Sequence, residues 1–182
     1  MATMILLPNG SSSVSSDWIT IPVTFPTTPP EEVLDDDNGA TSYVKCDDNN
    51  ETMIIEFANP SVVEADIDTI DSVRFLSSGR STHRSNASRV AFDFEVPSGN
   101  PQEIAFYDAS RSSYETINGT ARIVSDGAIP GAAWTYADLE NLEMKCTKAQ
   151  TTEIYLSYLA LEVTYTAVAV AADNATFFGA NF

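Results

Sequence analysis

The chain has 182 residues, of which 43% are hydrophobic and 19% are charged. Nine Lys and Arg residues against 26 Asp and Glu residues give a formal net charge of -17 at pH 7. A field of that sign repels phosphate backbones and anionic membrane surfaces, so it argues against nucleic acid and membrane as partners. The length predicts one domain with a sizeable core.

The first 16 residues are predicted to form an N-terminal arm. They begin with MATMILLP and continue as NGSSSVSS, which has neither the basic region nor the long apolar segment of a secretory signal. We therefore expect a protein that is made in the cytoplasm.

Alternating apolar and polar residues predict β-strands along residues 17–166, the expected domain. The clearest strands are ITIPVTF at 19–25 and RVAFDFEV at 89–96. Their inward residues are expected to be Ile19, Ile21, Val23 and Phe25 in the first and Val90, Phe92, Phe94 and Val96 in the second. Further strands are predicted at 41–46, 52–57, 69–76, 103–107, 113–117 and 120–125.

The acidic stretch LDDDNGATSYVKCDDNN at 34–50 raises the question of a metal site. It fails the calcium-loop pattern, because Gly stands at the fifth position and the twelfth lacks Glu. A strand of about six residues would hold its two acidic clusters about 20 Å apart. We therefore expect two acidic turns at opposite rims and no metal, while a calcium ion held by separate loops stays an open alternative.

Arginines gather between residues 74 and 89, in a chain that is otherwise acidic. Arg80 and Arg84 are the candidate interface residues, since guanidinium groups pair with carboxylates of a neighbouring protein. His83 is the chain's one histidine, and no nucleophile motif surrounds the nearby serines. A hydrolase centred on His83 is the least favoured function, and no catalytic residue, cofactor or enzyme activity is predicted.

One short helix is predicted near 135–144. Thr135 is a good N-cap and Asp138 completes a capping box, while Trp134 and Leu139 occupy the positions of a hydrophobic staple. Trp18, just before a strand, is expected in the core. The competing interpretation is that exposed Trp and Tyr side chains stack on glycan.

The strand at 153–166 is apolar on both faces. Such a strand is either covered on both sides or bulged midway, so that its faces exchange. With the other strands it predicts an all-β fold, a two-sheet antiparallel sandwich of jelly-roll type. An immunoglobulin-like sandwich is the alternative, although its Cys and Trp spacing is absent.

Residues 167–182 form a tail of small residues with Phe177, Phe178 and Phe182. These aromatic residues are candidate interface residues if the tail is an arm that docks on a neighbour. The alternative is that the tail folds back on its own domain. Cys46 and Cys146 are expected to be free thiols in a reducing cytosol, with a disulfide left open.

Four segments together resemble a layout of small β-sandwich virion proteins of tailed bacteriophages. They are MILLPNG followed by a Trp, LDDDNGATSYV, IDSVRF, and WTYADLENLE before IYLSYLALEVTYT, and they span residues 3–166. The resemblance implies a capsid decoration (cement) protein on the outer capsid, made in the host cytoplasm. Its partners would be the major capsid protein and copies of itself, as a homo-oligomer expected to be a trimer. The alternative is a tail or neck fibre, or a receptor-binding module for host glycan.

Overall fold

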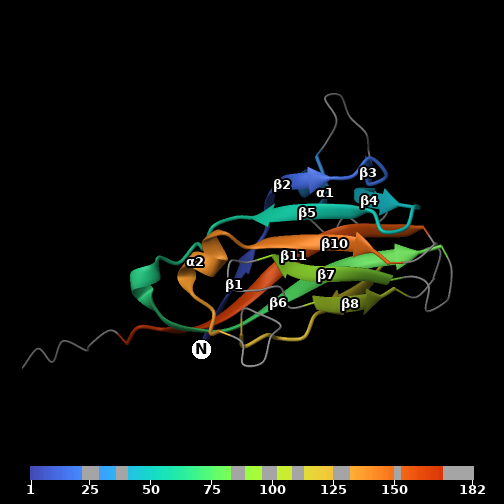
Figure 1. Cartoon of the computed structure of the whole chain (residues 1–182). Helices are drawn as coiled ribbons and strands as arrows, with labels where there is room; N and C mark the ends of the chain where they lie inside the picture. The colour runs from blue at the N-terminus through green and yellow to red at the C-terminus, as the bar shows by residue number, and fades with distance from the viewer. Residues whose placement is uncertain are drawn as a thin grey trace, which may run out of the picture.

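The computed structural model describes residues 1–21, 29–35, 41–82, 89–95, 102–107, 113–124, 132–149 and 153–169. These residues form two antiparallel β-sheets that pack face to face (Figure 1). The predicted all-β sandwich is therefore confirmed.

Each sheet is built from strands that are distant in the sequence. The first sheet has the order β3 (Ile19–Ile21), β4 (Tyr43–Cys46), β11 (Ile154–Ala167), β6 (Ile67–Ser81) and β9 (Glu115–Asn118), and β1 (Ala2–Leu6) also pairs with β11. The second sheet has the order β2 (Pro8–Val14), β5 (Thr52–Phe57), β10 (Glu143–Lys148), β7 (Arg89–Glu95) and β8 (Gln102–Phe106).

The strand order is that of a jelly roll. Within the first sheet β4-β11-β6-β9 are neighbours, and within the second β5-β10-β7-β8 are neighbours. Successive strands from β4 to β7 therefore alternate between the sheets, and β8 to β11 return across the gap in the same way. An eight-strand, two-sheet arrangement of this kind defines the jelly roll. The immunoglobulin-like alternative is set aside.

The core lies between the sheets and is made by residues that alternate along each strand. In β7, Val90, Phe92 and Phe94 are at most 1% exposed, as the alternation predicted. The rings of Phe92 and Phe75 stack across the core with their centroids 4.4 Å apart. This aromatic contact joins the second sheet to β6 of the first.

The long strand β11 is bulged, which explains why both of its faces read as apolar. Its register against β6 shifts between Leu156 and Tyr158. Ile154 and Leu156 face the core before the shift, and Leu159 and Leu161 face it afterwards. The extra residue at the bulge exchanges the two faces, which is the second of the two alternatives that the sequence left open.

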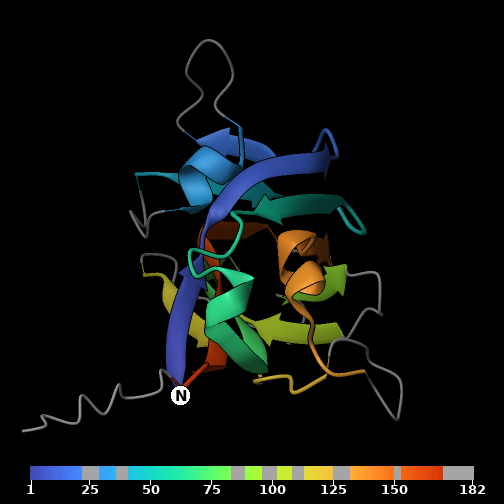
Figure 2. The same cartoon turned by 90° about the vertical axis from the view of Figure 1, so that its left-hand side faces the viewer.

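The expected N-terminal arm is part of the sandwich instead. β1 pairs with β11, and after Leu7 the chain crosses to the second sheet, where β2 pairs with β5 (Figure 2). Met4 and Leu6 are buried in the core. The segment MILLP has the period-two burial of a strand, but its exposed residues Ile5 and Leu7 are apolar too, so the sequence shows no alternation there.

Two predicted strand features are wrong. In β3, Ile19 is 40% exposed and Thr20 is 9% exposed, so the face is opposite to the predicted one. Trp18 fills the core beside this edge strand and fixes its phase. The strand predicted at 120–125 is reduced to isolated bridges at Arg122 and Val124. The predicted residues Val23, Phe25 and Val96 lie outside the described residues.

The predicted helix is shorter than expected. α2 (Tyr136–Glu140) begins with the predicted capping box, in which Thr135 and Asp138 each bond the other's backbone N–H. Residues 143–148 form β10, because Met144 and Cys146 alternate inward as in a strand. Two further short elements, α1 (Glu31–Leu34) and the 3-10 helix η1 (Glu64–Asp66), were not predicted. In the described part of the chain, none of the helices has the length and apolar character needed to cross a membrane.

Candidate functional site: a tyrosine and arginine surface on the first sheet

The candidate interface residues fall in different parts of the chain. Phe177, Phe178, Phe182, Arg84 and His83 lie outside the described residues. Arg80 lies near the end of β6, between the buried residues Gly79 and Ser81, so its side chain is on the outer face of the first sheet. The residues that surround Arg80 on this face are therefore described in the structure.

Strand pairing places one cation on each side of a tyrosine. Tyr155 of β11 is opposite Lys45 of β4 on one side and opposite Arg80 of β6 on the other. Ile19 of β3 is opposite Lys45 and extends the row to the sheet edge. Side chains that are directly opposite on one face lie about 5 Å apart at Cβ and interact.

Arg80 is held by aromatic rings. Its guanidinium carbon lies 3.8 Å from the centroid of the Tyr155 ring and 5.4 Å from that of Tyr114, which precedes β9. Both distances are within the range of cation–π attraction. Tyr43 packs edge-on against Tyr155, with the centroids 5.3 Å apart. The rings reduce the number of conformations open to the arginine, so less entropy is lost when it binds an anion.

Glu153 connects the charges of this surface. It accepts a hydrogen bond from Lys45 Nζ at 3.2 Å, in a pair whose side chains are 30% and 25% exposed. Burial works to raise the pKa of Glu153, but hydrogen bonds from Tyr155 and Lys45 outweigh it and hold that pKa below its usual value. Burial and the bond to Glu153 raise the pKa of Tyr155 to about 12.

We call these six residues the Arg80 surface: Tyr43, Lys45, Arg80, Tyr114, Glu153 and Tyr155. It combines two basic side chains, one acidic side chain and three tyrosines. A net positive area on a protein of charge -17 is suited to an acidic partner surface.

Sequence reasoning found Arg80 and missed its five neighbours. Tyr43 and Lys45 come from one segment and Glu153 and Tyr155 from another, more than a hundred residues away. In the predicted strands at 41–46 and 153–166, alternation indicates which side chains point outward. It does not indicate which strands are neighbours in the sheet.

The two tryptophans do not form a glycan platform. Trp18 and Trp134 are each 5% exposed. Trp134 donates from Nε1 to the carbonyl of Arg122 at 2.9 Å and packs edge-on against Phe94. Core packing explains Trp18, and both rings are covered where a sugar would have to stack.

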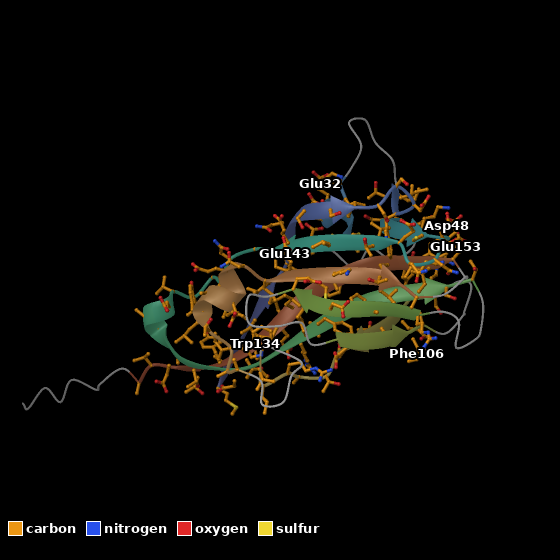
Figure 3. The ribbon with its side chains drawn as sticks, viewed as in Figure 1. Glu32, Asp48, Phe106, Trp134, Glu143 and Glu153 are labelled. Carbon is orange, nitrogen blue, oxygen red and sulfur yellow. The ribbon has the colours of Figure 1, made fainter. Side chains whose placement is uncertain are left out.

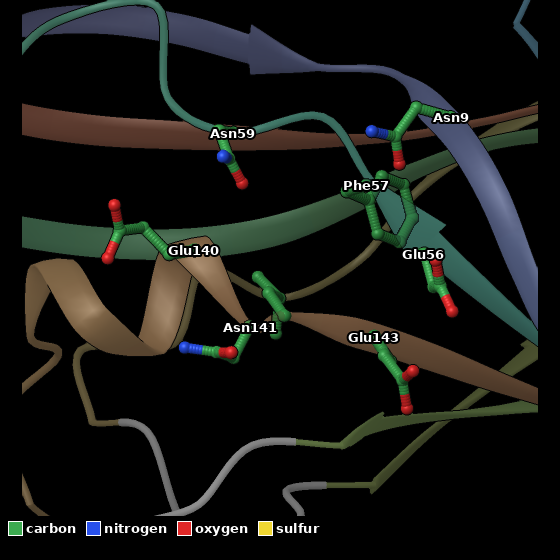
Figure 4. A pocket seen from close by; sticks show the side chains of 8 residues that line it. Asn9, Glu56, Phe57, Asn59, Glu140, Asn141 and Glu143 are labelled. Carbon is green, nitrogen blue, oxygen red and sulfur yellow. The ribbon is translucent and has the colours of Figure 1, made fainter.

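A pocket lies on the other sheet. This glutamate pocket has a volume of about 330 Å³ and is shown from close by in Figure 4. Glu56 and Glu143 extend side by side from paired positions of β5 and β10. The lining also includes Glu140, Asn9, Asn59 and Asn141. Carboxylates and amides of this kind can bind hydroxyl groups or cationic side chains.

The second acidic turn of the stretch 34–50 is organised by a lysine. Lys148 is 0% exposed, and its Nζ donates to the carbonyls of Asp47 and Asp48 at 2.7 and 2.9 Å. Burial lowers the pKa of Lys148. Asn50 completes the turn with a positive φ of 62°. The buried ammonium group therefore supplies the cation that this turn surrounds.

The first acidic turn of the stretch 34–50, where a metal site was considered, is described only in part. Residues 36–40, including Asp36, Asp37 and Asn38, lie outside the described residues. Among the residues that are described, no three Asp, Glu, His or Cys side chains are grouped so as to hold a metal ion.

Cys46 and Cys146 are free thiols on facing sheets. Burial raises the pKa of the Cys46 thiol to about 11, and burial also raises that of Cys146. Both thiols are therefore protonated at neutral pH and are poor nucleophiles and metal ligands. The prediction of free thiols is confirmed.

No family model matches the chain, and the search of curated proteins found no match either.

Proposed function

We propose that this protein is a non-enzymatic structural protein of a phage virion, a decoration (cement) protein that binds the outer capsid surface and stabilises it. The observation that carries the proposal is the jelly-roll strand order, an architecture found among viral capsid domains. A fold by itself does not define a function, so the proposal also needs a suitable surface.

The Arg80 surface is the proposed contact with the capsid or with a second copy. It lies at the opposite end of the strands from Trp134, on the side where Glu153 is labelled in Figure 3. The acidity of the rest of the protein supports the same role, because it disfavours binding to packaged DNA. It also keeps many crowded copies from clumping. The homo-oligomer, expected to be a trimer, is part of this proposal.

Charge reversal tests the contact. Arg80→Glu should weaken binding to particles lacking the protein by at least about tenfold. The change replaces a cation at the proposed interface with a negative charge, which the acidic partner surface repels. Lys145→Glu is the matched control, since Lys145 lies on the outer face of the second sheet, opposite Asp93. Cosedimentation with the particles measures both. Equal binding by Arg80→Glu and the unmodified protein would overturn the assignment of this surface.

Copy number tests the place in the virion. Several hundred copies per particle are expected for a capsid protein, and quantitative mass spectrometry of purified virions would count them. A few copies, or a few dozen, would instead indicate the tail, the neck or a fibre.

The second candidate is a fibre or receptor-binding module that recognises host glycan. The glutamate pocket favours it, because jelly rolls include lectins and its carboxylate and amide groups suit sugar hydroxyls. A glycan array should then show binding that is lost with Glu143→Gln and kept with Arg80→Ala. An array with no signal would remove this candidate.

A further inference from the structure

Two carboxylates of the glutamate pocket form a like-charge pair. Glu56 of β5 and Glu143 of β10 are directly opposite in the antiparallel ladder, and Figure 4 shows their side chains extending side by side. Like charges in directly opposite positions destabilise a sheet. Within the described part of the chain, neither carboxylate forms a salt bridge with a basic side chain. A cation from another molecule would offset this repulsion.

The surroundings of the pair add to its acidity. Glu140 also lines the pocket, whereas Lys145, on the same face of β10 as Glu143, is opposite Asp93 of β7. The volume of the pocket is about 330 Å³. Since a cavity of roughly 150 Å³ can hold a benzene ring, the pocket has room for the smaller guanidinium group of an arginine.

The Arg80 surface carries a row of the opposite sign on the other sheet. Lys45, Tyr155 and Arg80 are opposite one another on the adjacent strands β4, β11 and β6. Neighbouring strands lie about 4.8 Å apart, so the two basic residues are separated by two strands, or about 10 Å of sheet.

The glutamates form a row with the same spacing. Glu143 is opposite Glu56 on one side and opposite Glu95 of β7 on the other. The row therefore also crosses three adjacent strands, and its ends are again about 10 Å apart. One row has basic side chains at its ends and the other has acidic ones, so the two rows are complementary in sign and in spacing.

We propose that the Arg80 surface of one copy docks on the glutamate pocket of a second copy, with Arg80 facing Glu56 and Glu143. Hydrogen bonds between guanidinium and carboxylate groups are among the stronger ones in proteins. The second copy is the partner because this chain itself carries both complementary rows. The inference rests on the proposed function, and it names the surface that accepts the Arg80 surface in the homo-oligomer.

The positions of the two surfaces determine the kind of assembly. They lie on the outer faces of opposite sheets, and Figure 3 shows Glu143 of the pocket well apart from Glu153 of the Arg80 surface. Each copy can therefore donate one surface and accept with the other. Contacts of this head-to-tail kind generate closed rings when the rotation closes. A two-fold dimer through the Arg80 surface alone would instead place its basic side chains against each other.

Sedimentation velocity of the purified full-length protein, without particles, tests the contact. The unmodified chain should form closed oligomers of at least three copies. Arg80→Glu and Glu143→Arg should each raise the dissociation constant by at least about tenfold, because each places like charges across the contact. A variant with both changes restores an unlike pair, so it should associate at least about fivefold more tightly than either single variant.

The matched control is Glu32→Arg, the same substitution at an exposed residue of α1, which should associate as the unmodified chain does. Thermal unfolding shows whether each variant is folded. If a charge reversal prevents folding, the neutral changes Arg80→Gln and Glu143→Gln replace it. Their double variant should then lose less affinity than the sum of the two single losses.

Three results would overturn the proposal. They are an unmodified protein that is a monomer or a two-fold dimer, single variants that associate as it does, and a double variant that recovers nothing. The capsid role is tested separately by binding to particles. A closed oligomer that does not bind particles would contradict that role and keep this contact, whereas a monomer that coats particles would do the reverse.

Discussion

Gly79 of β6 lies where the Arg80 surface meets the core. A Cβ atom at this position would lie 2.7 Å from Tyr107 Cε1 and 2.8 Å from the backbone oxygen of Tyr155. Both distances are shorter than van der Waals contact, and one neighbour is main chain that cannot turn aside. The absence of a side chain is therefore what allows β11 and Tyr107 to approach β6 here.

Gly79→Ala should lower the free energy of unfolding by about 1–3 kcal/mol, the usual cost of overpacking a core. Urea denaturation measures it. Gly10→Ala is the control, because there the closest atom is the carboxylate end of the flexible Glu56 side chain. A loss at position 10 as large as that at position 79 would contradict this account.

Cys46 makes stability depend on pH in the alkaline range. Burial raises its pKa from 9.0 to about 11, so the folded state favours the protonated thiol. The resulting stability is complete below pH 9 and is lost as the pH rises to about 11, up to a limit of about 3 kcal/mol.

The comparison with Cys46→Ala isolates this contribution. Tyr155 and Cys146 titrate in both proteins and cancel in the difference, whereas Lys148, whose charge interacts with Cys46, contributes to it. The unmodified chain should lose its stability difference from Cys46→Ala between pH 9 and 11, as followed by urea denaturation at each pH. A difference that is constant over this range would show that the thiol titrates normally.

At the scale of elements, β1 is the segment that the sequence placed outside the domain. Leu6 is 1% exposed, while its neighbour Leu7 is 39% exposed. Both residues are leucines and they are adjacent in the sequence, so the same substitution at each position gives a matched pair.

Leu6→Ala should cost about 2–5 kcal/mol, because it leaves a cavity between the sheets. Leu7→Ala should cost less than about 1 kcal/mol. Thermal or urea unfolding of the two variants distinguishes a strand of the core from a detachable arm. Two small and similar losses would restore the interpretation of residues 1–16 as an arm.

β10 shows how an inward polar residue can conceal a strand. Met144, Cys146 and Lys148 all face inward, and no strand was predicted over residues 143–148. Lys148 is acceptable there because two carbonyls of the β4–β5 turn accept its hydrogen bonds. Those partners lie about a hundred residues away in the sequence, so only the folded chain reveals them.

For the whole molecule, the net charge of -17 is a source of repulsion that folding must overcome. Raising the salt from about 0.01 M to about 0.15 M shortens the Debye length from about 30 Å to about 8 Å. The melting temperature should therefore rise by several degrees over this range. Calorimetry in sodium chloride and in choline chloride would measure it.

The same change of salt should weaken the proposed contact of the Arg80 surface, because that contact is an attraction between unlike charges. The two effects have opposite signs and can be measured on one preparation. A melting temperature that falls with salt in both chlorides would mean that attractive pairs dominate within the folded chain.

The sequence predicted the inward face of β7, the capping box of α2 and, as one of two alternatives, the bulge in β11. These depend on neighbours within a few residues, where the periodicity of side chains is set by the local backbone. It also determined the sign of the protein's field, since net charge is a sum over residues.

Which strands are adjacent is seen only in the folded chain. That adjacency gathers Lys45, Arg80 and Tyr155 into one surface, draws β1 into the sandwich and turns Lys148 inward. The physical reason is that strand pairing and core filling are satisfied by partners far apart in the sequence, and local periodicity carries no information about which partner that is.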